Sequence, residues 1–334
     1  MDLLQRVCQR TMADEGHEME YWQWGQGVAL YGLAQAYLAT GEEAYLSYLK
    51  HWMDSHMERG LPGYSVNTTA PLLTALELYR LTGEERYYAL CKAFADWCIA
   101  QAPRSEKGAL EHSCTENVYP NQIWADTLYM GALFLANFSK ASGEALYMHE
   151  AMRQFVLHYA FLSNRETGLI VHGYYGNERI QRGMLWGRGN GWFSAASAML
   201  LELADTGHPL YQTIADNWKT HCEALLRFQR ADGGWNTVID DPASYLETSG
   251  TAAFAFGLSK ALEMGILPGD ARPAVEKAVS AVLEHIDETG ALCCASGGTC
   301  VMETAAEYNQ IPYAYSPFAQ GLALMVLAML QHNG

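Results

Sequence analysis

Residues 119–130, YPNQIWADTLYM, place one acidic side chain at the start of a strongly apolar segment. Asp126 is followed by no charged residue until Lys140, which is typical of a buried helix. A carboxyl group that is desolvated in this way has a raised pKa and can act as a general acid. An ordinary aspartate stabilised by a helix dipole is the competing interpretation, and the residues alone favour neither.

Residues 186–192, WGRGNGW, form a second candidate group. Glycines let the backbone approach a ligand closely, tryptophan faces stack on sugars, and arginine pairs bidentately with a carboxylate. A tight turn with two core tryptophans is the alternative, but a buried arginine needs a partner. We therefore expect Trp186, Arg188, Asn190 and Trp192 to contact a ligand.

Five further side chains fall in segments that we expect near the same site. They are Trp24, Asn67, Trp124, His172 and Trp235. Asn67 can equally open a helix, and a lone histidine such as His172 is more often structural than catalytic.

The elements that position these residues follow from a short repeat. TGEEAY at 40–45 recurs as TGEERY at 82–87, SGEALY at 142–147 and TGHPLY at 206–211, with a fainter copy around Gly265. An amphipathic run precedes and follows each copy. Glycine closes a helix in the left-handed conformation, and acidic residues favour the first turn of the next helix. Each copy therefore predicts a tight αα-hairpin.

Periodicity predicts about twelve helices. Their ranges are 2–13, 24–39, 43–58, 69–81, 84–101, 124–141, 144–161, 190–205, 209–229, 249–264, 271–287 and 315–331. Long loops precede alternate helices, and these helices are the more apolar ones. We therefore expect an all-α fold, a single (α/α)6 barrel over residues 1–334, with the loops gathered at one mouth. Residues 169–175 look too short to contribute to a sheet.

Composition limits the partners of this barrel. The 334 residues include 37 acidic and 21 basic side chains, a formal net charge of −16, and no Lys/Arg cluster, so no nucleic acid is expected. No apolar run could span a membrane, and the N-terminus lacks a signal pattern, which predicts a cytoplasmic protein. Cys293, Cys294 and Cys300 have a spacing that matches no zinc pattern, and no motif calls for a metal or organic cofactor.

Three segments in order, NQIWADTLYM, WGRGNGW and LETSGTAAFAFGL, resemble the unsaturated rhamnogalacturonyl hydrolases of glycoside hydrolase family 105. The resemblance spreads over residues 20–330, and the glucuronyl hydrolases of family 88 are related. It implies an (α/α)6 barrel that acts on oligosaccharides ending in a 4,5-unsaturated uronic acid. Such enzymes hydrate the C4=C5 double bond, the resulting hemiketal opens, and the aglycone leaves.

The resemblance also implies residue roles. Asp126 would be the general acid/base, Arg188 would bind the uronate carboxylate, Trp186 and Trp192 would line the sugar site, and His172 would position substrate or water. The net charge fits a short oligosaccharide with one terminal carboxylate better than a long polyuronate.

Two departures from the family pattern leave alternatives open. Asn67 stands where the family often has a second aspartate, and Thr115 and Glu116 replace a His-Lys pair of the rhamnogalacturonyl members. A non-catalytic carbohydrate-binding protein on the same fold therefore remains an alternative. A conventional (α/α)6 glycosidase is another; it needs two carboxylates, for which Glu116, Glu178 and Glu247 are candidates beside Asp126.

Overall fold

The computed structural model describes residues 2–13, 15–105, 107–115 and 119–332. Helices dominate it, as the all-α prediction requires. The α-helices are α1 (Leu3–Ala13), α2 (Trp24–Thr40), α3 (Glu43–Arg59), α4 (Leu72–Thr82), α5 (Glu85–Ala100), α6 (Leu133–Ser142), α7 (Ala145–Leu162), α8 (Gly187–Leu203), α9 (Tyr211–Arg227), α10 (Thr248–Glu263), α11 (Arg272–Glu284), α12 (Ala305–Tyr308) and α13 (Pro317–His332). Short 3₁₀ turns form η1 (Asn67–Thr69) and η3 (Gly269–Ala271), and a π-helical turn forms η2 (Leu128–Ala132).

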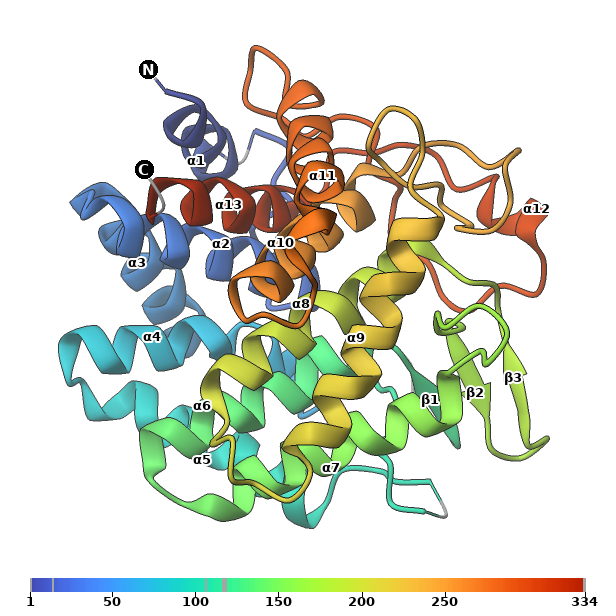
Figure 1. Ribbon diagram of the computed structural model, residues 1–334. Helices are drawn as coiled ribbons and strands as arrows, with labels where there is room; N and C mark the ends of the chain where they lie inside the picture. The colour runs from blue at the N-terminus through green and yellow to red at the C-terminus, as the bar shows by residue number, and fades with distance from the viewer. Residues whose placement is uncertain (1, 14, 106, 116–118, 333–334) are drawn as a thin grey trace.

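The long helices alternate between two layers. In the described residues, α2, α4, α6, α8, α10 and α13 form an inner layer, and α1, α3, α5, α7, α9 and α11 surround it (Figure 1). The inner helices are apolar on all sides: α8 is buried continuously from Gly187 to Leu201. The N-terminal helix α1 packs on the last helix α13, so the hairpins close into the predicted (α/α)6 barrel.

Glycines end most inner helices. Gly41, Gly83 and Gly143 follow α2, α4 and α6 with φ of 68°, 69° and 75°, and Gly265 follows α10 with φ of 68°. These left-handed residues confirm four of the five predicted glycine stops. The prediction is wrong for Gly207, which does not have a positive φ. There α8 has already ended at Leu203, and the Asp205 carboxylate accepts the Gly207 N–H instead.

The tyrosine of the repeat joins neighbouring hairpins. The Tyr87 hydroxyl of α5 donates to the Asp54 carboxylate of α3 at 2.7 Å, and Tyr147 of α7 donates to Asp96 of α5 at 2.6 Å. The repeat therefore encodes contacts along the outer layer as well as the turn itself.

Long loops precede the inner helices, as predicted, and gather at one mouth of the barrel. Two of them meet in a three-stranded antiparallel sheet of β1 (Gln122–Trp124), β2 (Gly173–Tyr175) and β3 (Ile180–Arg182), in the order β1-β2-β3. Figure 1 shows this sheet and α12 on the right, with the turn between α4 and α5 on the left. The prediction that residues 169–175 are too short for a sheet is wrong, because strands of three residues suffice when two loops pair.

The barrel closes where α2 packs against α13. Gly32 and Gly321 lie at this crossing. A Cβ on Gly321 would collide with the Val28 carbonyl, and a Cβ on Gly32 would lie 2.5 Å from the Gly321 oxygen. Two glycines therefore allow the backbones of the first and last inner helices to touch.

Three further features of the described chain concern its cysteines, possible metal ligands and membrane-spanning potential. None of the eight cysteines, all of which lie in the described ranges, forms a disulfide. Within the described ranges, no three His, Cys, Asp or Glu side chains are grouped to hold a metal ion, and none of the helices is long and apolar enough to cross a bilayer.

Candidate active site

A pocket of about 300 Å³ opens at the loop-bearing mouth. Its described lining residues are Gln23, Trp24, Asn67, His112, Cys114, Tyr119, Trp124, Asp126, Gly298, Thr299 and Cys300. The structure therefore brings together four predicted site residues, Trp24, Asn67, Trp124 and Asp126. They meet because each lies at or just before the start of an inner helix, where the loops converge.

Asp126 lies at the first turn of the helix that follows β1, and only 9% of the residue is exposed. The N–H of its neighbour Ala125 donates to the carbonyl of His172, the residue just before β2, at 3.0 Å, which connects this helix start to that loop. The π-helical turn η2 follows directly. Such wide turns occur often at functional sites because they place a side chain where a regular helix would not.

His172 lies behind Asp126 and is fully buried. Its Nε2 is 3.4 Å from Asp126 Oδ2, and its Nδ1 is 2.6 Å from the Tyr308 hydroxyl. The Met302 N–H donates to that same hydroxyl, so the phenolic proton is available for Nδ1. This pattern assigns the imidazole proton to Nε2, facing the carboxylate. At 3.4 Å the contact is an electrostatic attraction rather than a well-formed hydrogen bond.

The pKa of Asp126 is shifted in the direction opposite to the one that its burial predicts. Burial acts to raise it, but the attraction to His172 and His112 outweighs burial, and the pKa lies below the ordinary aspartate value. The prediction of a raised pKa rests on burial alone, and here the contact with His172 and the nearby His112 act in the opposite direction and outweigh it. Burial lowers the pKa of His172, which keeps that ring neutral.

His112 and Tyr119 also line the pocket and were not among the predicted site residues, although Tyr119 opens the segment YPNQIWADTLYM. The His112 ring stacks on Trp124 at 4.3 Å between centroids, and Tyr119 packs on the same indole at 4.4 Å. Burial lowers the pKa of His112 to about 4, so this ring is a neutral partner for a ligand. Their place in the loop just before the Asp126 helix was the one available signal.

Arg188 does not reach this pocket. Its side chain is fully buried, and its guanidinium donates to the Ser296 carbonyl and hydroxyl and to the Gly297 carbonyl, at 2.7 to 3.1 Å. It also lies 4.5 Å from the Trp186 ring centroid. Both terminal nitrogens of Arg188 are thus used by the chain itself, and Arg188 is not among the described residues that line the pocket, so the structure does not place it where the expected contact with a substrate carboxylate would form.

Arg188 and Glu247 instead hold one loop from two sides. Their closest atoms are 3.7 Å apart, and both side chains are completely buried. Glu247 accepts the Ser296 N–H at 3.0 Å, while Arg188 binds the carbonyl side of the same residue. Gly298, Thr299 and Cys300 follow immediately and form a wall of the pocket. We call this Arg188–Glu247–Ser296 group the loop clamp.

The other residues of WGRGNGW support the site from below. Trp186 is buried against His172, with 4.1 Å between ring centroids. The Asn190 amide is buried and bonds to the backbone N–H and carbonyl of Ile170 at 2.9 and 2.8 Å. The expectation of direct sugar contact is therefore wrong for Trp186 and Asn190, whose polar and aromatic surfaces are covered.

Trp192 and Trp235 are core residues as well, and the same expectation is wrong for both. Trp192 is fully buried on the barrel axis between Trp24, at 6.1 Å, and Tyr129, at 5.0 Å. Tyr129 in turn donates to the Met325 sulfur at 3.3 Å. Trp235 donates its indole N–H to the Leu225 carbonyl at 2.9 Å within the outer layer.

Only one carboxylate, Asp126, is found among the described residues that line the pocket. Glu247 belongs to the loop clamp, and Glu178 pairs with Arg182 at 2.6 Å. Glu116 lies outside the described residues. Thr115 is at the pocket rim, where its hydroxyl accepts from the Gln23 amide at 3.0 Å.

A family profile and curated relatives match most of the chain. The family profile described as Glycosyl Hydrolase Family 88 matches residues 3–332. The chain is 35% identical over 333 residues to the unsaturated rhamnogalacturonyl hydrolase YesR of Bacillus subtilis, covering 98% of this chain and 93% of that one. It is 27% identical to an unsaturated 3S-rhamnoglycuronyl hydrolase of an Alteromonas species, over 80% of this chain and 68% of that one.

The fold has a close counterpart among solved structures. A possible member of the GH105 family from Salmonella enterica superposes with a TM-score of 0.94 at 29% identity, covering 100% of this chain and 95% of that one.

Proposed function

The chain belongs to Glycosyl Hydrolase Family 88 and is a glycosidase acting on unsaturated uronates, and we propose that Asp126 is the proton donor that starts its reaction. The substrate in this proposal is a short oligosaccharide that ends in a 4,5-unsaturated uronic acid. The reaction adds water across C4=C5, after which the hemiketal opens and the remaining saccharide leaves.

One observation carries the assignment: Asp126 is the one carboxylate among the described pocket residues. A conventional glycosidase needs two carboxylates on opposite sides of the scissile bond. Hydration of a vinyl ether needs a single group that gives a proton to C4 and takes one back from water. The pocket supports the second chemistry, and Asn67 serves as a hydrogen-bonding amide beside it.

The residues around Asp126 have distinct parts in this proposal. Asp126 donates its proton to C4 while water adds its oxygen to C5, and the proton released by that water returns to the carboxylate. His172 Nε2–H faces Asp126 and stabilises it in the anionic form. Trp24, Trp124 and Tyr119 supply aromatic surface for the sugar ring.

In this proposal, binding of the substrate converts Asp126 from the ionised to the protonated form. Its pKa is low in the free pocket, yet a general acid must carry a proton. The described lining includes no Lys or Arg, so a bound uronate adds a negative charge that no neighbouring cation cancels. Like charges disfavour the ionised form, so binding raises the pKa of Asp126 and loads it with a proton.

The test is Asp126→Asn, assayed by loss of the ultraviolet absorbance of the double bond in lyase-generated oligosaccharides. We expect a loss of about 10²- to 10⁴-fold in kcat, the usual range for a missing general acid. Asn67→Ala, in the same pocket, should act mainly on KM and is the matched control. Turnover by Asp126→Asn at the normal rate would end the assignment, and unchanged absorbance with tight sugar binding by the natural chain would favour a binding protein.

Two finer proposals accompany this one. Eight cysteines without a disulfide among them support action in the reducing cytoplasm. The contact between α1 and α13 supports one domain over residues 1–334.

A further inference from the structure

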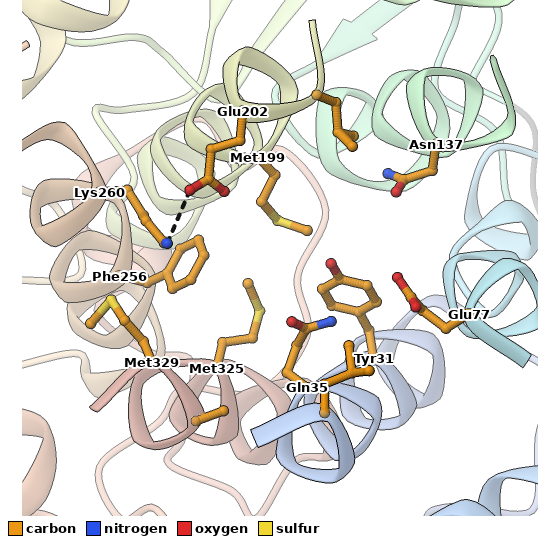
Figure 2. Close-up of a pocket in the computed structure, with 13 residues that line it drawn as sticks. Tyr31, Gln35, Glu77, Asn137, Met199, Glu202, Phe256, Lys260, Met325 and Met329 are labelled. Carbon is orange, nitrogen blue, oxygen red and sulfur yellow. Dashed lines mark ion pairs between the residues drawn. The ribbon is translucent and has the colours of Figure 1, made fainter. Parts of the chain in front are cut away.

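A second cavity, of about 210 Å³, lies at the opposite mouth of the barrel, where the short turns are. Each of the six inner helices of the described chain contributes to it. The lining residues are Tyr31, Gln35, Leu38, Glu77, Asn137, Met199, Glu202, Leu203, Phe256, Lys260, Met325, Ala328 and Met329. Figure 2 shows these side chains pointing into the space between the helix ends.

The electrostatics of this cavity favour positive charge. The inner helices all end here, and helix C-termini carry partial negative charge. Lys260 is neutralised by Glu202 at 3.0 Å and Glu263 at 3.1 Å, and Glu77 pairs with Arg80 at 2.7 Å. Among the described lining residues, Glu77 and Glu202 are acidic and Lys260 is basic, so the lining itself carries one excess negative charge before the helix ends are considered.

Tyr31 shows that the cavity has unmet hydrogen-bonding capacity. The residue is only 8% exposed, and Figure 2 shows its hydroxyl directed into the cavity next to Glu77. No described group of the protein forms a hydrogen bond with this hydroxyl. Asn137 donates its amide N–H to the Leu133 carbonyl, which leaves its amide oxygen available as an acceptor. The polar side of the cavity is thus rich in acceptors.

The other side of the cavity is apolar. Phe256, Met199 and Met325 face the acceptors across the space (Figure 2). An aromatic face attracts a cation, and methionines adapt to irregular aliphatic shapes. A ligand that fits both sides has a positive head and a short apolar body.

We propose that this cavity binds a small organic cation, a protonated primary amine with a short alkyl chain. The ammonium group lies between the Glu77 carboxylate, the Tyr31 hydroxyl and the Asn137 amide oxygen. The alkyl chain lies against Phe256 and the methionines. This site is separate from the pocket of Asp126 and does not depend on the proposed hydrolase reaction.

Calorimetric titration with butylammonium chloride tests the proposal, with 1-butanol as the uncharged probe and sodium chloride at equal ionic strength. We expect binding of butylammonium and none of 1-butanol. Glu77→Gln and Tyr31→Phe should weaken that binding at least tenfold, while Glu284→Gln, an exposed change on α11 outside the cavity, should not. Thermal melting of each variant verifies that it is folded.

Lys260→Gln provides a test of opposite sign. It removes a positive charge from the cavity and frees Glu202, so butylammonium should bind several-fold more tightly. The proposal is wrong if the natural chain does not bind butylammonium, if 1-butanol binds as well, or if the Glu77, Tyr31 and Lys260 variants all bind as the natural chain does. Hydrolase activity should stay unchanged in all of them, so failure here is distinguishable from failure of the Asp126 assignment.

Discussion

The two mouths of the barrel handle charge differently. At the loop-bearing mouth, Asp126, His172, Arg188 and Glu247 are all buried. At the short-turn mouth, the ion pair of Lys260 and Glu202 keeps 21% and 41% of its side chains exposed. The difference follows from the connections, because long loops supply partners for buried charges, such as Ser296 and Tyr308. A glycine turn supplies none, so charges there remain partly hydrated.

The two mouths are separated by packed side chains along the barrel axis. Trp24 lines the pocket of Asp126, Trp192 and Tyr129 follow beneath it, and Met325 lines the second cavity. The barrel therefore contains two pockets back to back rather than one channel. Changes at one mouth should leave the chemistry of the other intact, and this separation can be tested.

The largest expected contrast is between Arg188→Gln and Lys260→Gln. Removing Arg188 leaves Glu247 buried without its cation, which costs about 3–5 kcal/mol in the free energy of unfolding. It also releases the wall of Gly298–Cys300, so KM should rise. Removing Lys260 breaks an exposed pair and should cost about 0–1 kcal/mol.

Denaturant unfolding and steady-state kinetics measure both effects. Arg188→Lys keeps the charge and should recover part of the stability, which guards against a variant that does not fold. Equal stability of Arg188→Gln and Lys260→Gln would show that burial of the loop clamp does not increase its contribution to the free energy of unfolding.

A second prediction concerns the loop-bearing mouth alone, where uronate binding should be coupled to protonation of Asp126. The pKa of Asp126 lies below its ordinary value, and the negative charge of a bound uronate should raise it. Between these two pKa values, binding takes up protons, so kcat/KM should increase as the pH falls from neutral. Galacturonate has no C4=C5 double bond and therefore binds without reacting. Calorimetric titration of the protein with galacturonate near pH 5, in buffers of different ionisation enthalpy, should show uptake of up to one proton.

Two controls accompany this measurement. Neutral galactose should give no proton uptake, and Asp126→Asn should abolish the uptake seen with galacturonate. Uptake that persists in Asp126→Asn would assign the proton to another group of the pocket.

A small effect is expected for Gly83→Ala at the short-turn mouth. The space around Gly83 is open, but its φ of 69° disfavours a side chain, so we expect a cost of about 1 kcal/mol. Melting temperature should fall slightly, and hydrolase activity should not change. Gly269→Ala, also in open space but without a positive φ, is the matched control; an equal loss in both would remove the conformational explanation.

The helices and their arrangement were predictable because the signals are local. A glycine stop, an acidic first turn and an uncharged inner helix each lie within a few residues, and together they imply closed hairpins. Two predictions failed, one because it depends on pairing between distant segments and one because a helix ends in a different way than expected. The sheet of β1, β2 and β3 forms between distant loops, and Gly207 follows a helix that ends without a left-handed residue.

The site was predictable only in part, for a related reason. Asp126, Asn67, Trp24 and Trp124 start inner helices or lie just before them, so the repeat places them at one mouth. The exposure of Arg188 depends instead on how residues 296–297 fold over it, which no local pattern encodes. The lowered pKa of Asp126 likewise depends on His172, whose partner Tyr308 is 136 residues away in the chain.

The glycine crossing of α2 and α13 has a consequence for how the molecule folds. These helices are the first and last of the inner layer, so their contact closes a loop that includes almost every other helix. Forming it requires a large loss of chain entropy before any packing is gained, and such contacts slow folding. Until α13 docks, α2 presents to solvent the apolar face that carries Gly32. A folding intermediate with five inner helices in place should therefore be the species most exposed to aggregation, and substitutions at Gly32 or Gly321 should increase its lifetime before they alter the site.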